Sequence, residues 1–295
     1  MVGILSLDVE TDRPGERLSV HRVARLPGVE FWSVRDSMRH WQMHHDTFTA
    51  SLIGGASSLN ATWNYRGRNQ SVSAGHMQLI EPGEAHKTTS VSEPASFFVI
   101  WWHPDVLAQA AESLGVSGAV HLKISQTTHP ALRASFQGLL SGVEYGEDAA
   151  FIEEQFLDST QRLLELCGER KAPSRPPGSH PAIAKVRARI HEQFAETLSL
   201  ERLAREVGLS KFHIARCFKE AVGVPPHQYQ KLLRLQNARR CIERGACVRE
   251  AAAASGFSDE AHLSRSFREW LGVSPGMWRR AAAPRRITSI SAAGG

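Results

Sequence analysis

A repeat in the last third of the chain constrains its fold more than any other feature of the sequence. Four residues recur 48 positions later: Leu200, Ala204, Gly208 and Ser210 return as Val248, Ala252, Gly256 and Ser258. Five more recur 49 positions later: Ile214, Arg216, Phe218, Gly223 and Val224 return as Leu263, Arg265, Phe267, Gly272 and Val273. Repetition of this kind indicates one supersecondary unit used twice.

Each copy has the residue pattern of two helices joined by a sharp turn. A first helix, expected at about 200–207 and again at 248–255, carries an alanine where a second helix must approach closely. A glycine follows and supplies a left-handed cap. Ser210 in one copy, and Ser258 or Asp259 in the other, can cap the next helix. The pattern predicts two helix-turn-helix units.

The segment between the two copies predicts a connecting helix. Pro225 and Pro226 open it, and the mixture of apolar and polar residues continues to about residue 244. A single continuous helix would hold the two units at a fixed separation. Two rigid units of this type can enter successive major-groove segments of DNA, about 34 Å apart.

A proline-rich stretch divides the chain and coincides with a change in charge. The segment "KAPSRPPGSHP", residues 171–181, has a composition in which neither helix nor strand persists. Residues 1–181 hold 15 Lys and Arg against 20 Asp and Glu, whereas residues 182–280 hold 18 against 10. We therefore expect an acidic domain at 1–170, a linker at 171–181 and a basic domain at 182–281 that meets a polyanion.

The acidic part is predicted to be a β domain followed by helices. Between about 20 and 105, apolar and polar residues alternate in short runs broken by turn signals, which is typical of an antiparallel barrel or sandwich. From about 104 to 170 the pattern becomes helical. The expected fold class is α+β: an antiparallel β-barrel with helices, followed by an all-α domain with two helix-turn-helix units.

One helical segment in the acidic part has a heptad-like seam. Its residues are spaced by four and three positions: Ile152, Phe156, Ser159, Leu163 and Leu166. Two heptads fit two interpretations equally well, a helix packed on its own domain or a homodimer contact through the 151–167 helix. The small-residue end of the chain, 282–295, is expected to be disordered.

Several classes of protein do not fit the sequence. The longest apolar run of note, "FFVIWW" at 97–102, is far shorter than a membrane span. The first residues lack a cationic segment and turn acidic, so we expect no signal peptide. The four cysteines contain no CxxC pair, which argues against a zinc knot or a disulfide framework. A reduced, cytoplasmic compartment is the expected location.

The basic half resembles the DNA-binding domain of the AraC/XylS family of bacterial transcription regulators. The matching stretches are "LSLERLAREVGLSKFHIARCFKEAVGVPPHQY", "RLQNAR" and "AAAASGFSDEAHLSRSFREWLGVSPGMWR". The resemblance extends over residues 182–280, although the second copy is richer in alanine than the usual pattern. The resemblance implies that outward residues early in each second helix contact bases. The DNA-binding residues expected from it are Lys211, Phe212, Ala215, Arg216, Lys219, Glu260, Ala261, His262, Arg265 and Arg268.

The chemistry of these side chains suits the two kinds of DNA contact. Arg216 and Arg265 can grip guanine in bidentate fashion. Phe212 can contact a thymine methyl group, and Glu260 can accept a hydrogen bond from cytosine. Lys211, Lys219 and Arg268 suit phosphates.

The acidic half resembles, less specifically, the cupin-like effector domain of the same family. The stretches that carry this likeness are "HHDTF", "YRGRNQSVSAGHMQLIEPGEAH" and "FFVIWWHP". The resemblance implies a small organic effector bound in the mouth of the barrel, between apolar walls and a few polar groups. The expected effector-binding residues are Trp41, His45, Trp63, His86, Phe97, Val99 and Trp101.

Two other functions are weighed against this interpretation. A metal-dependent cupin enzyme is suggested by His44, His45, His76 and His86, but the metal pattern needs two histidines one residue apart followed by a glutamate, and Met43 stands where the first would be. An alkyl-accepting repair protein needs a cysteine cluster, and the first half has Cys167 alone. We therefore expect no cofactor, metal or catalysis, and a transcription regulator whose partners are double-stranded promoter DNA, an effector and RNA polymerase.

Overall fold

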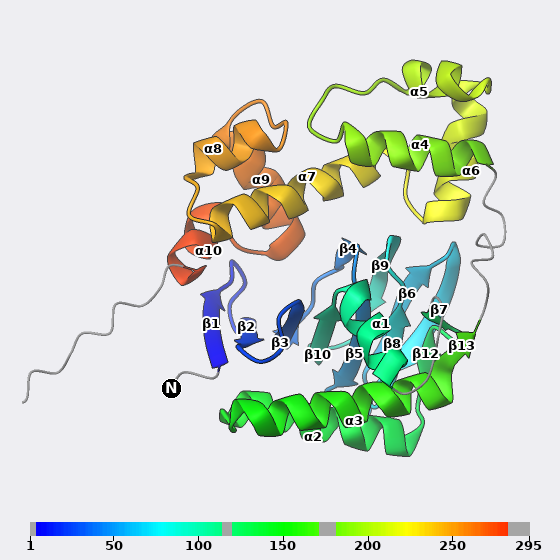
Figure 1. The fold of residues 1–295 in the computed structure, drawn as a ribbon. Coiled ribbons are helices and arrows are strands. Elements are labelled where there is room, and N and C mark those ends of the chain that lie inside the picture. Colours follow the sequence, from blue (N-terminus) through cyan, green and yellow to red (C-terminus); the bar gives the residue numbers. More distant parts are fainter. Residues whose placement is uncertain (1–3, 114–119, 171–180, 283–295) are drawn as a thin grey trace, which may run out of the picture.

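The computed structural model describes residues 4–113, 120–170 and 181–282, with strands in the first part of the chain and helices in the last (Figure 1). The strands are β1 Ile4–Glu10, β2 Arg17–Val23, β3 Val29–Ser37, β4 Gln42–His45, β5 Phe48–Gly54, β6 Asn60–Tyr65, β7 Arg68–Ser73, β8 Met77–Ile80, β9 Glu84–Val91, β10 Ala95–Trp102, β11 Val120–Leu122, β12 Gln126–Thr127 and β13 Gly168–Arg170. The helices are α1 Pro104–Ser113, α2 Pro130–Tyr145, α3 Ala149–Cys167, α4 Pro181–Glu192, α5 Leu200–Val207, α6 Lys211–Val222, α7 Pro226–Glu243, α8 Val248–Ala254, α9 Glu260–Leu271 and α10 Pro275–Ala282.

Two main antiparallel sheets form most of the first half, and a third, small sheet pairs β11 with β13. The larger main sheet has the strand order β1-β2-β3-β10-β5-β8-β12, and the smaller has the order β4-β9-β6-β7. The chain changes sheet after β3, and Asp36, next to the last residue of that strand, adopts a left-handed φ of 56°. The expected antiparallel, cupin-like α+β fold is confirmed, but the described strands form three separate sheets and do not close into one hydrogen-bonded barrel.

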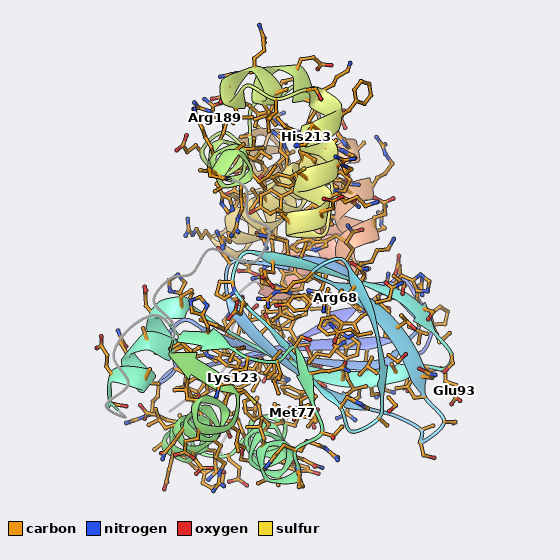
Figure 2. The ribbon with its side chains drawn as sticks, turned by 90° about the vertical axis from the view of Figure 1, so that its right-hand side faces the viewer. Arg68, Met77, Glu93, Lys123, Arg189 and His213 are labelled. Atoms are coloured by element: carbon orange, nitrogen blue, oxygen red, sulfur yellow. The ribbon has the colours of Figure 1, made fainter. Side chains whose placement is uncertain are left out.

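Strand β10 divides its side chains between two cores. It lies between β3 and β5 in the larger sheet. Because successive side chains of a strand point to opposite faces, Phe98, Ile100 and Trp102 join the core under α2 and α3. Those two helices cover this face of the sheet, opposite the helical half (Figures 1 and 2).

The heptad-like seam of α3 belongs to that same core. Ile152, Phe156, Ser159 and Leu163 are buried, and Phe156 meets the ring of Trp102 edge-on at 6.3 Å. Leu166 alone is exposed, at 42%. The interpretation as a helix packed on its own domain is therefore correct, and the four buried residues are not a dimer seam.

The first strand was missed at the sequence level, where strands were expected from about residue 20. Strand β1 pairs with β2 along its length, from Ile4 with Val23 to Glu10 with Arg17. Only Leu7 and Val9 of this strand are buried. Two inward positions between acidic neighbours are too short an alternation to identify a strand from the sequence.

The last third contains the two expected helix-turn-helix units. Helices α5 and α6 form one unit, and α8 and α9 form the other, joined by the expected connecting helix α7. Gly208 ends α5 in the left-handed region, with φ 69°, and Gly256 takes the same conformation, with φ 74°, one residue after the cap of α8. These positive φ values are the reason for glycine at both turns.

The two halves share a hydrophobic core. Leu7, Trp32 and Trp101 from the sheets pack in one cluster with residues of α7, α9 and α10, including Phe267 and Trp278. The rings of Trp32 and Trp278 are 5.6 Å apart. No pattern in the sequence indicates this packing between the halves. The expected linker and tail, apart from Pro181 and Ala282, lie outside the described residues.

None of the helices in the described ranges combines the length and the apolar character that a bilayer crossing requires.

Candidate functional site

Helix α6 begins and packs in a way that fixes which of its faces is outward. The backbone N–H of His213 donates to the Ser210 hydroxyl at 3.2 Å, which caps the first turn. Ile214 and Phe218 are fully buried against α4, α5 and α7. The opposite face carries Phe212, 78% exposed, and Arg216, whose side chain is 69% exposed. Phe212 and Arg216 therefore share the outward face of the helix.

The cations of α6 are free to exchange partners. Lys211 Nζ lies 3.1 Å from Glu201, and Arg216 Nε lies 4.0 Å from Glu220. Such exposed ion pairs are weak because water screens them, so DNA can replace them at little cost. Ala215 is partly exposed and Lys219 is exposed on the same helix.

Helix α9 repeats this arrangement with one difference. Asp259 is its N-cap and accepts from the N–H of His262 at 2.7 Å, so aspartate rather than Ser258 caps this copy. Leu263 and Phe267 are buried, as their counterparts are in α6. The exposed positions are Glu260, Ala261, Arg265 and Arg268. His262 is partly buried, because its ring bonds to Ser258 at 3.1 Å and meets the edge of Phe257.

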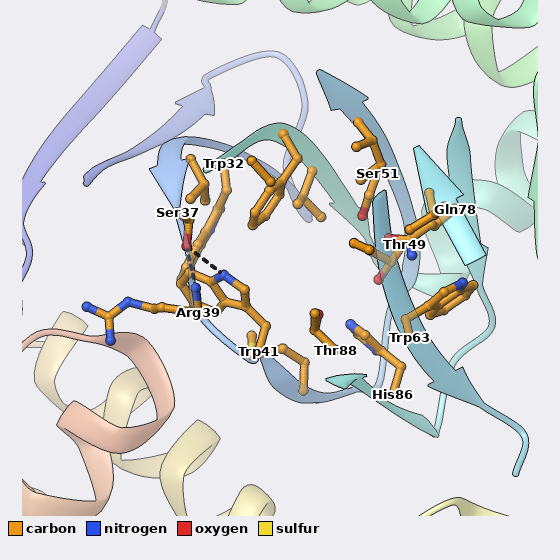
Figure 3. A pocket seen from close by; sticks show the side chains of 18 of the residues that line it. Trp32, Ser37, Arg39, Trp41, Thr49, Ser51, Trp63, Gln78, His86 and Thr88 are labelled. Carbon is orange, nitrogen blue, oxygen red and sulfur yellow. Dashed lines mark hydrogen bonds between the residues drawn. The ribbon is translucent and has the colours of Figure 1, made fainter. Parts of the chain in front are cut away.

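A cavity of about 90 Å³ lies in the first half, between the two sheets (Figure 3). All seven residues expected to bind an effector line it: Trp41, His45, Trp63, His86, Phe97, Val99 and Trp101. The structure therefore brings together side chains from β4, β6, β9 and β10, and Trp41 from the segment before β4. Sequence reasoning missed other lining residues, among them Trp32, Arg39, Thr49, Ser51, Gln78 and Thr88.

Aromatic rings form a continuous belt around this cavity. The ring centres of Trp32 and Trp101 are 4.4 Å apart, and those of Trp101 and His45 are 4.9 Å apart. The belt continues from His45 to His86 at 5.2 Å and from His86 to Trp63 at 6.1 Å. These walls suit a flat apolar molecule.

The cavity carries no available charge. Burial lowers the pKa of His86 to about 4. Burial, and then the neighbouring His86, hold the pKa of His45 well below its usual range, so both imidazoles are neutral at neutral pH. Arg39 is the one charged residue in the lining, and it is paired with Glu16 at 2.6 Å and with Asp12. Figure 3 shows its side chain pointing away from the cavity.

Several polar atoms of the lining are buried without a partner among the described residues. They are Thr49 Oγ1, Trp63 Nε1, His86 Nδ1 and Trp101 Nε1. Buried polar groups are normally hydrogen-bonded, and an unpaired one costs about 1–3 kcal/mol. A group of such atoms around one cavity is what a ligand with its own polar atom would complete.

The histidines that suggested a metal site do not converge. His44 and His45 are consecutive in β4, so they point to opposite faces: His45 lines the cavity, whereas His44 meets the ring of Tyr229 on α7 at 4.6 Å. His76 bonds to Ser73 at 3.1 Å in a turn. No group of three or more His, Cys, Asp or Glu placed to hold a metal occurs within 4–113, 120–170 and 181–282.

A charged cluster joins the cavity wall to the helical half. Arg239 of α7 lies 3.0 Å from Glu30 of β3, and their side chains are only 16% and 13% exposed. The Arg239 guanidinium also lies 5.5 Å from the rings of Trp32 and Trp101 and 5.8 Å from that of Trp278. Trp32 and Trp101 therefore line the cavity and also contact α7, a helix of the other half.

Neighbouring contacts complete this cluster. Arg22 bonds to Glu30 at 2.5 Å and to Glu243 of α7 at 3.1 Å. The Trp32 indole N–H donates to Glu30 at 2.8 Å. Burial pushes the pKa of Glu30 upward, but the charges of Arg239 and Arg22 together outweigh it and leave the pKa below its ordinary value. Nothing in the sequence singles out Glu30 or Arg239, because their meeting depends on packing across 209 residues.

Comparisons with known proteins match both halves. A model of a helix-turn-helix domain matches residues 203–281, and a model of the AraC-like ligand-binding domain matches residues 60–164. An uncharacterised transcriptional regulator of Bacillus subtilis, YbfI, is 26% identical over 80% of this chain and 86% of its own length. The transcriptional activator RhaS of Salmonella paratyphi B is 23% identical over 79% and 84%. The crystal structure of ToxT from Vibrio cholerae O395 has the same fold, with a TM-score of 0.52 at 12% identity over 87% of this chain and 98% of that one.

Proposed function

The chain belongs to the AraC/XylS family of transcription regulators, and from this premise we propose which of its residues bind DNA and effector. It has a ligand-binding amino-terminal half and a helix-turn-helix DNA-binding half. Helices α6 and α9 are the two reading helices. The observation that carries this assignment is the matched placement of outward arginines, Arg216 and Arg265, at equivalent positions of two capped helices whose other faces are buried.

The roles within each helix follow from exposure and chemistry. Arg216 and Arg265 read guanine, and Phe212 contacts a thymine methyl group. Lys211, Lys219 and Arg268 hold phosphates and fix the register. Glu260 and Ala261 face the same groove, whereas His262 keeps its contacts with Ser258 and Phe257 and has a smaller part in reading.

The cavity between the sheets is the effector site, and no catalytic step is assigned to it. Its occupant would touch Trp32 and Trp101, on which Arg239 of α7 also rests. A molecule that shifts these indoles therefore changes how firmly α7 is held against the sheets. The size of such a switch is limited by the difference in effector affinity between the two arrangements.

The remaining partners and boundaries are also proposals. We infer domains at 1–170 and 182–281, joined by a linker at 171–181, and action on promoter DNA in the cytoplasm together with RNA polymerase. A homodimer through the 151–167 helix would have to use its outward face, which carries Phe151, Leu157 and Leu166, because the seam itself is buried.

Selection of DNA from a random pool by the purified full chain tests the assignment. Two base-specific blocks, their centres about one helical turn apart, are expected, because two reading helices follow one duplex. The Arg216→Ala variant should lose base preference at one of the two blocks, and the Arg265→Ala variant should lose it at the other. Recovery of DNA with no preferred sequence, or variants that weaken the same block, would refute the proposed reading helices.

A further inference from the structure

We propose that the cavity takes an uncharged molecule of about one ring, with a flat apolar body and a single hydroxyl or carbonyl group. This inference rests on the proposed function of the cavity as an effector site and narrows the chemistry of the effector. It excludes sugars and carboxylic acids as the natural class.

The volume sets the size. The cavity measures about 90 Å³, which is less than the cavity of about 150 Å³ that holds benzene in another protein, so even a single ring requires the lining side chains to move outward. A molecule with more than one ring would have to push apart walls that are built from strands β5, β6, β9 and β10. The cavity therefore favours one small ring.

The two sides of the cavity differ in character, and this sets the shape of the ligand. Trp32 and Trp41 lie on one side with Ser37, whereas Thr49, Ser51 and His86 lie on the other with Trp63 (Figure 3). The ring of Trp41 meets Phe97 edge-on at 6.0 Å, which extends the aromatic side. An apolar ring can pack on the indoles while one polar group turns to the hydroxyl side. A sugar has hydroxyl groups around its whole ring and would bury several of them against indole.

The buried polar atoms of the lining that lack a partner decide which polar group the ligand can carry. Thr49 Oγ1 and His86 Nδ1 are buried without a partner among the described residues. One ligand oxygen placed between them can accept a hydrogen bond from the threonine hydroxyl, and a ligand hydroxyl can also donate to the imidazole. This arrangement satisfies a carbonyl or a hydroxyl group.

The charges exclude an anion. Arg39 is the one side chain of the lining that carries a permanent charge, and its guanidinium is occupied by Glu16 and Asp12. His45 and His86 are neutral at neutral pH, since burial lowers the pKa of each. A carboxylate would lose its hydration in this cavity without gaining a counter-charge.

Thermal unfolding and tryptophan fluorescence of the full chain, titrated with four probes, test the inference. The probes are benzyl alcohol, toluene, sodium benzoate and D-glucose. Benzyl alcohol should raise the unfolding temperature with a saturable dependence on concentration. Benzoate should bind at least about 10-fold more weakly because it is charged, and glucose should have no effect.

Matched variants locate the polar contact. Thr49→Val keeps the shape of the side chain and removes its hydroxyl, so benzyl alcohol should bind about 3- to 10-fold more weakly and toluene equally well. Thr89→Val, on the exposed neighbour of Thr88, is the control and should change neither. Equal losses for both probes in Thr49→Val would contradict the assigned hydrogen bond.

Two cavity-filling variants separate failure of the ligand class from failure of the site. Val99→Phe and Ala61→Leu, each checked for folding by circular dichroism, should abolish benzyl alcohol binding. If benzoate or glucose binds as tightly as benzyl alcohol and the filled variants lose it, the ligand class is wrong and the effector site stands. If no probe binds, the ligand class is also wrong. If binding survives in both filled variants, the cavity is not the ligand site and the effector part of the proposed function fails.

Discussion

His44 and His45 show how one step along a strand changes the role of a side chain. Both imidazoles are buried, but one faces the cavity and the other faces Tyr229 of the helical half. The sequence predicts that both lie in the β domain, and it predicts His45 at the cavity. It cannot predict the place of His44, because the face of β4 that meets α7 is decided by contacts between distant segments.

The burial of His44 predicts a dependence of stability on pH. Burial, followed by the charges of Arg187 and His191, lowers its pKa to about 3, whereas the pKa of a histidine in an unfolded chain is about 6.5. Between these values the unfolded chain binds a proton that the folded chain does not. Stability is therefore complete above about pH 6.5 and falls as the pH drops below it.

Urea unfolding at pH 7.5 and pH 5 measures this effect. In the wild type, His44 should lower the free energy of unfolding by up to about 2 kcal/mol between pH 7.5 and pH 5. His44→Phe keeps a ring against Tyr229 but removes the titrating group. Its free energy of unfolding should therefore fall less than that of the wild type over the same interval, and the difference should equal the contribution of His44. A variant with the same pH dependence as the wild type would show that His44 titrates normally. His227→Phe, at a residue exposed in α7, is the control and should leave the dependence unchanged.

Two cations of α6 should differ in what they contribute to DNA binding. Arg216→Ala is expected to cost about 1–3 kcal/mol on the selected operator and to relax preference at one base pair. Lys219→Ala should weaken operator and random DNA alike and should flatten the salt dependence of binding. Fluorescence anisotropy at several salt concentrations measures both. Equal losses of Arg216→Ala on the two kinds of DNA would make this arginine a phosphate contact.

At the scale of elements, local signals identified most of the helical half. Capping residues and glycine turns act within a few positions, so the bounds of α5, α6, α7 and α9 follow closely from the sequence. The alternation of "FFVIWW" likewise placed Phe97, Val99 and Trp101 on one face of β10. The docking of α7 on β3 and β4 has no local signal, and this is why Glu30, Trp32 and Arg239 were missed.

The docking of α7 is expected to depend on Arg239 far more than on its neighbour. Arg239→Ala leaves the largely buried Glu30 with the cation of Arg22 and the indole N–H of Trp32, and removes the cation from three indole rings. A loss of about 2–4 kcal/mol in the free energy of unfolding is expected. Arg240→Ala, which breaks an exposed pair with Asp46, is the control and should cost about 0–1 kcal/mol. Urea titration followed by tryptophan emission compares the two variants. Equal, small losses in the free energy of unfolding would argue against the charged cluster as the contact that holds the two halves together.

A shared core joins the two reading helices to the domain that holds the effector cavity. The sequence predicted both halves and the function of each, but it holds no signal for the contact between them. The structure joins them through Trp32, Trp101 and Trp278, so the helical half expressed alone would expose apolar surface that β1, β3 and β10 cover in the full chain. Such long-range packing cannot be derived from patterns within one segment.

The central claim is that a single chain reads two adjacent major-groove segments with α6 and α9, at a separation that α7 fixes. The most direct test is the affinity of the full chain for its selected operator before and after insertion of about half a helical turn, roughly 5 base pairs, between the two blocks. The insertion turns the second block to the far side of the duplex, and affinity should fall at least about 100-fold, to that of one block alone. Unchanged affinity after the insertion would contradict the claim.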